Sequence, residues 1–171
     1  IQLLRGVTTA RLPETVFLEN REKVAALSDD DASYEAQNLR ASVKHHRDWM
    51  ASNERRTHMR WAWRTFFQQW DILLCPTAAS AAFPHDQQGE RWDRTISVNG
   101  APQSAVDQLF WAGLTGVVLL PSTVAPAGLT RSGLPTGVQI VGPSMHDLRT
   151  IDFARLLADE VGGFQPPPDY I

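Results

Sequence analysis

The sequence predicts an α/β fold, with a partial mixed or mostly parallel β-sheet and flanking helices. Residues 14–70 show helical periodicity, whereas residues 71–162 alternate short apolar runs with helical segments. Proline or glycine ends most of the apolar runs, as expected of buried strands. Strands that alternate with helices favour a largely parallel sheet. We therefore expect one domain over residues 1–171, with an extended proline-rich tail at residues 163–171.

The leading part of the chain is predicted to hold three helices. Residues 14–27 are mostly good helix formers and follow Pro13, which is typical of a helix start. The aspartates at 29–31 predict a break and an N-cap for the second helix. Its apolar stripe consists of Leu39, Val43, His46 and Met50. The third helix carries a bulkier stripe of the same period, made of Met59, Trp63, Phe66, Phe67 and Trp70. We expect this aromatic face to pack on a core; the wall of a ligand pocket is the alternative.

Short apolar or β-branched runs predict the strands, which cover residues 71–76, 94–98, 116–120 and 136–141. The pair Asn99-Gly100 is a turn signal that closes the second of these strands. Residues 105–113 predict a helix and residues 124–135 a loop. Asp147 is expected to cap a last helix, which ends at Gly162-Gly163. So few short strands beside long helices indicate part of a larger sheet.

Charge and cysteine content narrow the class of protein. The net charge of −3 favours neither a nucleic-acid partner nor an anionic membrane surface. Cys75 is the only cysteine, so no internal disulfide can form and a reducing compartment, the cytoplasm, is expected. No apolar run approaches the roughly 20 residues of a membrane span, and no membrane partner is predicted.

Several segments carry a family resemblance. Residues 133–142, Gly-Leu-Pro-Thr-Gly-Val-Gln-Ile-Val-Gly, resemble the C-terminal signature of amidase-signature enzymes. The run 71–77 resembles the family's strand that ends in Pro-Thr, and residues 82–86 a loop of one branch of the family. Further matching segments, in order, are residues 111–116, 120–121, 124–128 and 162–164. The resemblance covers the chain from about Leu39 onward and implies the C-terminal part of the amidase-signature fold.

The resemblance implies hydrolysis of carbon–nitrogen amide bonds by a Ser-Ser-Lys set, without a cofactor. A serine hydroxyl needs a base to become a nucleophile, and a lysine serves as that base only when its pKa is lowered. This sequence has no two adjacent serines, and its two lysines, Lys23 and Lys44, lie in helical, charged stretches. We therefore assign no catalytic residue and expect the chain to be inactive alone. Its expected partners are a missing N-terminal catalytic part and a small-molecule amide substrate.

Four residues are candidates for the substrate-binding site. Thr77 follows a strand end, where open α/β sheets bind ligands. His85 and Asp86 lie in the adjacent loop, and Trp111 lies beside a family motif. A loop cap, a turn or core packing is the alternative for each. Gln139 has apolar neighbours on both sides, so its amide is expected to be buried and to hold the structure through hydrogen bonds, with substrate contact as the alternative.

Histidine, cysteine and arginine residues of the chain also admit other interpretations. His45-His46 with His58 does not have zinc-like spacing, because adjacent helical histidines diverge by about 100°. Cys75 inside an apolar run favours an inert thiol. The arginines at 55, 56, 60 and 64 indicate a solvated face. A standalone, non-catalytic module for binding or packing is the rival function, and a homo-oligomer stays open.

Overall fold

The computed structural model describes residues 1–167, and its contacts divide the chain into two compact units, residues 1–59 and residues 60 onward. The expectation of one domain over the whole chain stays a prediction. The last part of the expected extended tail, residues 168–171, lies outside the described residues. No helix among residues 1–167 is long and apolar enough to cross a membrane.

The first unit consists of helices. They are α1 (Gln2–Thr8), α2 (Glu14–Ala25), α3 (Tyr34–Ser42) and the beginning of α4 (His46–Phe66). The predicted helix after Pro13 is confirmed as α2. Leu3, Ala36 and Ala41 form a small buried core between α1 and α3. The unit therefore rests on few apolar contacts, supplemented by polar ones such as the hydrogen bond from Trp49 Nε1 to the Leu3 carbonyl, 3.1 Å.

Two helix boundaries in this unit differ from the prediction. The N-cap of α3 is Ser33, whose Oγ accepts from Ala36 N at 3.1 Å, rather than one of the aspartates at 29–31. Asp31 lies just before this cap, and its Oδ1 accepts a hydrogen bond from Ser33 N at 2.8 Å. The predicted stripe from Leu39 to Met50 is also broken, because α3 ends at Ser42 and α4 begins at His46. The Ser42 hydroxyl donates to a backbone carbonyl of the last turn, a local bond that competes with helix continuation.

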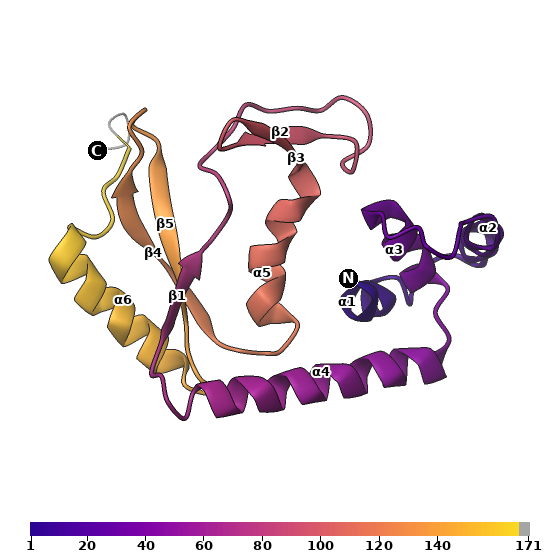
Figure 1. Ribbon diagram of the computed structural model, residues 1–171, viewed down its shortest axis with the longest axis horizontal. Helices are drawn as coiled ribbons and strands as arrows, with labels where there is room; N and C mark the ends of the chain where they lie inside the picture. The colour runs from indigo at the N-terminus through magenta and orange to yellow at the C-terminus, as the bar shows by residue number, and fades with distance from the viewer. Residues whose placement is uncertain (168–171) are drawn as a thin grey trace. The chain divides into compact units, whose positions relative to one another are not determined.

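The second unit contains a three-stranded sheet and a hairpin, shown in Figure 1. The sheet has the order β1 (Leu73–Pro76), β5 (Pro135–Val141), β4 (Ser122–Leu129). The hairpin joins β2 (Thr95–Val98) to β3 (Ala101–Ser104) through Asn99 and Gly100, both at positive φ as a type I′ turn requires. Predicted strands at 71–76, 94–98 and 136–141 and the predicted turn are confirmed.

The mixed α/β class is confirmed, but the expectation of mostly parallel pairing is wrong. Both β1 and β4 pair antiparallel to β5. For β4 and β5 the cause is a short connection, closed by a hydrogen bond from Thr130 N to the Leu134 carbonyl at 2.8 Å. A turn of this kind joins antiparallel strands, whereas parallel strands need a long crossover.

The strand predicted at 116–120 and the loop predicted at 124–135 are also wrong. The predicted helix at 105–113 appears as η1 (Ala105–Gln108) and α5 (Leu109–Gly116), and a further turn follows. The strand comes later, as β4, despite the proline and the glycine in it. β4 lies at a sheet edge and has an irregular register between Pro126 and Gly128, which is where such residues are tolerated.

The register of the sheet gives it two distinct faces. Cys75, Gln139 and Val124 are aligned across the three strands on one face, which receives α5. The neighbouring row, Leu74, Ile140 and Thr123, lies on the opposite face, where Thr123 Oγ1 is 2.8 Å from Thr150 Oγ1 of α6 (Asp147–Val161). α6 thus packs on the second face, whereas α5 is joined to the first face by the Gln139–Trp111 hydrogen bond and leaves Val124 exposed there.

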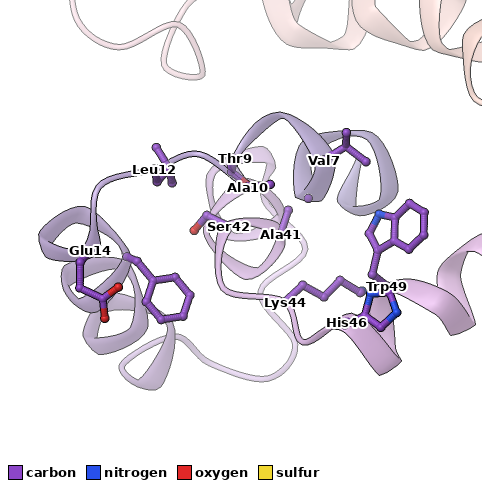
Figure 2. Close-up of a pocket in the computed structure, with 12 residues that line it drawn as sticks. Val7, Thr9, Ala10, Leu12, Glu14, Ala41, Ser42, Lys44, His46 and Trp49 are labelled. Atoms are coloured by element: carbon purple, nitrogen blue, oxygen red, sulfur yellow. The ribbon is translucent and has the colours of Figure 1, made fainter.

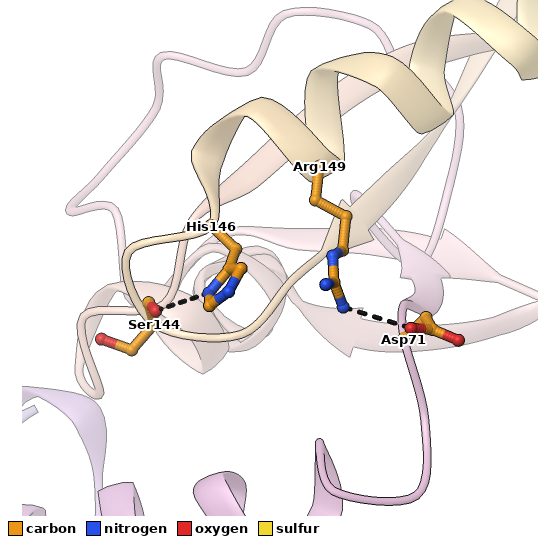
Figure 3. Close-up of polar contacts among 4 residues, drawn as sticks. All are labelled: Asp71, Ser144, His146 and Arg149. Carbon is orange, nitrogen blue, oxygen red and sulfur yellow. Dashed lines mark hydrogen bonds and ion pairs between the residues drawn. The ribbon is translucent and has the colours of Figure 1, made fainter.

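The last helix begins slightly differently from the prediction. His146 is the N-cap of α6 and Asp147 its first residue, whereas Gly162 ends the helix in the left-handed conformation as predicted. Figure 3 shows two polar contacts at this start: His146 Nδ1 donates to the Ser144 carbonyl at 3.0 Å, and Arg149 pairs with Asp71 at 3.2 Å. Asp71 is largely exposed, so the ion pair contributes little to stability.

The aromatic stripe at the end of α4 forms a cluster. The rings of Trp63, Phe66, Phe67 and Trp70 pack on one another with centroids 5.1 to 6.4 Å apart. The first three are half-buried, whereas Trp70 and Met59 are exposed. These contacts join rings of one segment, residues 63–70, so the expectation that this face packs on a core stays a prediction.

Candidate functional site

Polar groups gather after the carboxyl end of β1. Thr77 follows that strand, and its Oγ1 donates to the Gly137 carbonyl of β5 at 3.4 Å. Two residues later, Ala79 N donates to Gln108 Oε1 at 2.7 Å. Because Gln108 precedes α5, this bond holds the segment that follows β1 against the beginning of α5.

Two buried polar atoms of this region have no partner among the described residues. They are the hydroxyl oxygen of Ser80 and the amide nitrogen of Gln108. A buried polar group without a partner costs about 1–3 kcal/mol, and native proteins rarely leave one so. The Ala79–Gln108 bond brings the two residues to the same region, since Ser80 is next to Ala79. A ligand that carries both an acceptor and a donor, such as an amide, would satisfy both atoms.

Gln139 joins the sheet to α5. Its side chain is buried, and its Nε2 lies 3.3 Å from both the Trp111 carbonyl and Cys75 Sγ. The predicted burial and structural hydrogen bonding of Gln139 are confirmed. The same contact makes the Cys75 sulfur an acceptor inside the sheet, in agreement with an inert thiol.

The four predicted substrate-binding residues are only partly brought together. Thr77 is half-buried after β1, and Trp111 is half-buried in α5, with its ring edge-on to Phe110 at 5.1 Å. His85 and Asp86 are exposed in the long loop before β2, where Asp86 Oδ1 accepts from Gln88 N at 2.9 Å. Within residues 1–167 no hydrogen bond or ion pair joins any two of the four. Their role in binding stays a prediction.

Sequence reasoning missed Ser80 and Gln108. Ser80 lies in a run of alanines, and Gln108 is one polar residue at a helix start, so neither stands out. Only one weak signal points to Ser80. It lies in a segment of small residues directly after a predicted strand that ends in Pro-Thr, and open sheets bind ligands at such strand ends.

The described residues hold no assembled catalytic set. Adjacent serines do not occur in the sequence. Lys23 is exposed, and Lys44 belongs to the first unit, where its Nζ donates to Gln2 Oε1 at 2.5 Å. Burial, with the neighbouring Arg55, lowers the pKa of Lys44, but its hydrogen-bond partner is an amide and not a serine. Within residues 1–167 no cluster of three or more His, Cys, Asp or Glu side chains could hold a metal.

Comparison with known proteins gives a consistent result. The Amidase family model matches residues 17–151. An indoleacetamide hydrolase of Bradyrhizobium diazoefficiens is 28% identical over 156 residues, which are 87% of this chain and 27% of that protein. An acylamidase of Rhodococcus erythropolis is 34% identical over 85 residues, which are 50% of this chain and 17% of that protein.

Solved structures show the same fold. A chain from a vestigial protein complex, described in connection with the evolutionary origins of an s-triazine catabolic enzyme, superposes with a TM-score of 0.60 at 17% identity. The match covers 87% of this chain and 32% of that one. A crystal structure of an amidase gives a TM-score of 0.58 at 17% identity, over 83% and 31% of the two chains.

The chain thus spans about a third or less of the length of these relatives. The family model nevertheless matches well over half of it, from α2 into α6. The chain belongs to the amidase family.

Proposed function

We propose that this chain is the C-terminal part of an amidase that hydrolyses carbon–nitrogen bonds. It contributes strands, covering helices and part of the substrate pocket, while an N-terminal part contributes the nucleophile and its base. The proposal rests on the extent of two matches. The family model matches residues 17–151, yet the matched region is only 27% of the length of the indoleacetamide hydrolase relative. The single cysteine keeps the cytoplasm as the proposed location.

The surface of the second unit supports a missing partner. Both edge strands of the three-stranded sheet, β1 and β4, have one side on which no described residue pairs as a strand. Large apolar side chains that are more than half exposed lie on β4 and around α6; they are Val124, Leu129, Met145, Leu148, Ile151, Leu156 and Phe164. Apolar surface of this extent is typical of an interface. A further part of the protein that adds strands and covers these side chains would account for it.

The pocket part of the proposal rests on Ser80 and Gln108. An amide substrate has a carbonyl oxygen that accepts and, when unsubstituted or mono-substituted, an N–H that donates. Gln108 Nε2 is a donor, and the Ser80 hydroxyl both donates and accepts. We place the amide group or a neighbouring polar group of the substrate against these two atoms, at the carboxyl end of β1 and beside Thr77.

Two substitutions test this assignment in the enzyme formed with the N-terminal part. Ser80→Ala removes an oxygen that has no partner within residues 1–167, and Gln108→Glu removes the donor but keeps the oxygen that binds Ala79 N. We expect each to lower kcat/KM for amides by about tenfold or more, mainly through KM, because the contact exists before and during the reaction. The measurement is steady-state ammonia release.

The matched controls lie on the exposed hairpin. Ser97→Ala on β2 and Gln103→Glu on β3 make the same chemical changes at exposed positions, so their kinetics should equal those of the parent. Ser80→Ala should also leave the melting temperature unchanged or raise it, since no protein hydrogen bond is lost. The assignment is wrong if Ser80→Ala and Gln108→Glu both keep kcat/KM within twofold of the controls.

A non-catalytic module for binding or packing is the second candidate. The absence of adjacent serines from the sequence favours it. The two candidates differ in one respect that can be measured: only the amidase part gains amide hydrolysis when it is joined to the segment that precedes it in its gene.

A further inference from the structure

The first unit contains a cavity of about 530 Å³ that is open to solvent on one side, shown in Figure 2. Its walls come from α1, the loop that follows α1, the start of α2, the end of α3 and the start of α4. A volume of this size is in the range of small-molecule sites, about 300–1,000 Å³. All of its lining residues belong to the first unit, so it is separate from the candidate pocket after β1.

Most of the wall is apolar. Val7, Ala10, Leu12, Phe17 and Ala41 line it, and Trp49 and His46 stand at one end with their rings stacked at 6.4 Å and 15°. The indole is held in place, because its Nε1 donates to the Leu3 carbonyl at 3.1 Å. On the other side, Cδ1 of the indole lies so close to Gly6 that a Cβ there would approach it to 3.2 Å. The aromatic end is therefore formed before any ligand binds.

One lysine adds a positive charge to this wall. Lys44 is half-buried, and Figure 2 shows its side chain extending toward His46 and Trp49. Its ammonium donates to Gln2 Oε1 at 2.5 Å, which leaves two of its three hydrogens, and it makes no ion pair within residues 1–167. Arg55 nearby adds repulsion and Asp48 a weaker attraction, and burial is the first cause of the lowered pKa of Lys44.

A carboxylate group of a ligand would pair with the Lys44 ammonium. It would accept the free hydrogens of the ammonium and compensate a charge that is partly withdrawn from water. Glu14, the only acidic residue of the lining, lies at the opposite end of the cavity in Figure 2, where its carboxylate does not compete for Lys44. The apolar wall and the fixed indole suit an aromatic or aliphatic body.

We propose that this cavity binds a small monocarboxylic acid with an aromatic or apolar body. The carboxylate lies on the Lys44 ammonium, and the body lies between Leu12, Phe17 and the Trp49 indole. This binding does not depend on the amidase function proposed above.

Calorimetric titration of the full chain with three probes that share a benzyl group tests the charge requirement. The probes are phenylacetate, phenylacetamide and 2-phenylethylamine. We expect phenylacetate to bind with one site per chain, and at least tenfold more tightly than the neutral amide or the cationic amine, because only the carboxylate pairs with Lys44. Equal affinity for phenylacetate and phenylacetamide, or no binding of phenylacetate, overturns the proposal.

Two lysine substitutions locate the site. Lys44→Met keeps the apolar stem and removes the charge, and it should weaken phenylacetate binding at least tenfold. The matched control is Lys23→Met, because Lys23 is the only other lysine and is exposed on α2. Its affinity should equal that of the parent chain. Equal affinity of the two variants overturns the assignment to this cavity, and the comparison of the three probes decides the case even where Lys44→Met does not fold.

Discussion

Replacement of Ile140 by alanine is expected to lower the free energy of unfolding by about 2–5 kcal/mol. Ile140 lies in the central strand β5, is fully buried, and is flanked by Leu74 of β1 and Thr123 of β4 on the face that α6 covers. Truncation leaves a cavity between three strands and a helix, which cannot close without moving the sheet. Urea unfolding followed by circular dichroism measures the effect.

Ile151→Ala is the matched control for this change. It removes the same atoms from a side chain on α6 that is 54% exposed, so the expected effect is within about 0.5 kcal/mol. A loss of stability for Ile140→Ala no larger than that of Ile151→Ala would show that β5 is not the centre of the core.

Gly142→Ala is expected to cost about 1–3 kcal/mol, although only one methyl group is added. A Cβ at this position would lie 2.7 Å from Cγ2 of Thr150. Thr150 cannot rotate away without a loss, because its Oγ1 is 2.8 Å from both Thr123 Oγ1 and the Asp147 carbonyl. The end of β5 and the start of α6 are therefore too close for any side chain larger than hydrogen.

The double substitution Gly142→Ala with Thr150→Ser tests the stated cause. Serine keeps the oxygen with its two hydrogen bonds and lacks the methyl group that clashes, so most of the lost stability should return. Gly113→Ala serves as a second comparison, since a Cβ there meets nothing within 4 Å inside α5 and should stabilise by about 0.5–1 kcal/mol. Additive effects of the two changes at Gly142 and Thr150 would rule out the contact between them as the cause.

The sequence predicts the elements whose signals are local. The apolar runs that become β1 and β5, the Asn99-Gly100 turn and the glycine that ends α6 each reveal themselves within a few residues. β4 could not be found in this way, because Pro126 and Gly128 read as a loop and are tolerated only by an edge strand with an irregular register. Strand direction also escaped prediction, since it depends on a turn at residues 130–134 whose closure is not visible in the pattern.

The residues of the candidate site also differ in whether a local sequence pattern predicts them. The burial of Gln139 follows from its apolar neighbours in a strand, and the structure confirms it. The proposed role of Ser80 and Gln108 rests on a hydrogen bond that spans 29 residues and on two buried atoms without a partner among the described residues, neither of which a local pattern contains. The predicted roles of Thr77, His85, Asp86 and Trp111 stay predictions, because no contact among the described residues tests them.

Ammonia release from simple amides, measured side by side for the 171-residue chain and for the product of the whole reading frame that contains it, tests the central claim most directly. We expect no turnover by the chain alone and turnover by the longer product that a serine-directed reagent abolishes. Equal turnover by the two proteins would contradict the claim that the catalytic groups lie outside this chain. An absence of turnover in both, over a panel of aryl and alkyl amides, would contradict the assignment to an active amidase and favour the non-catalytic module.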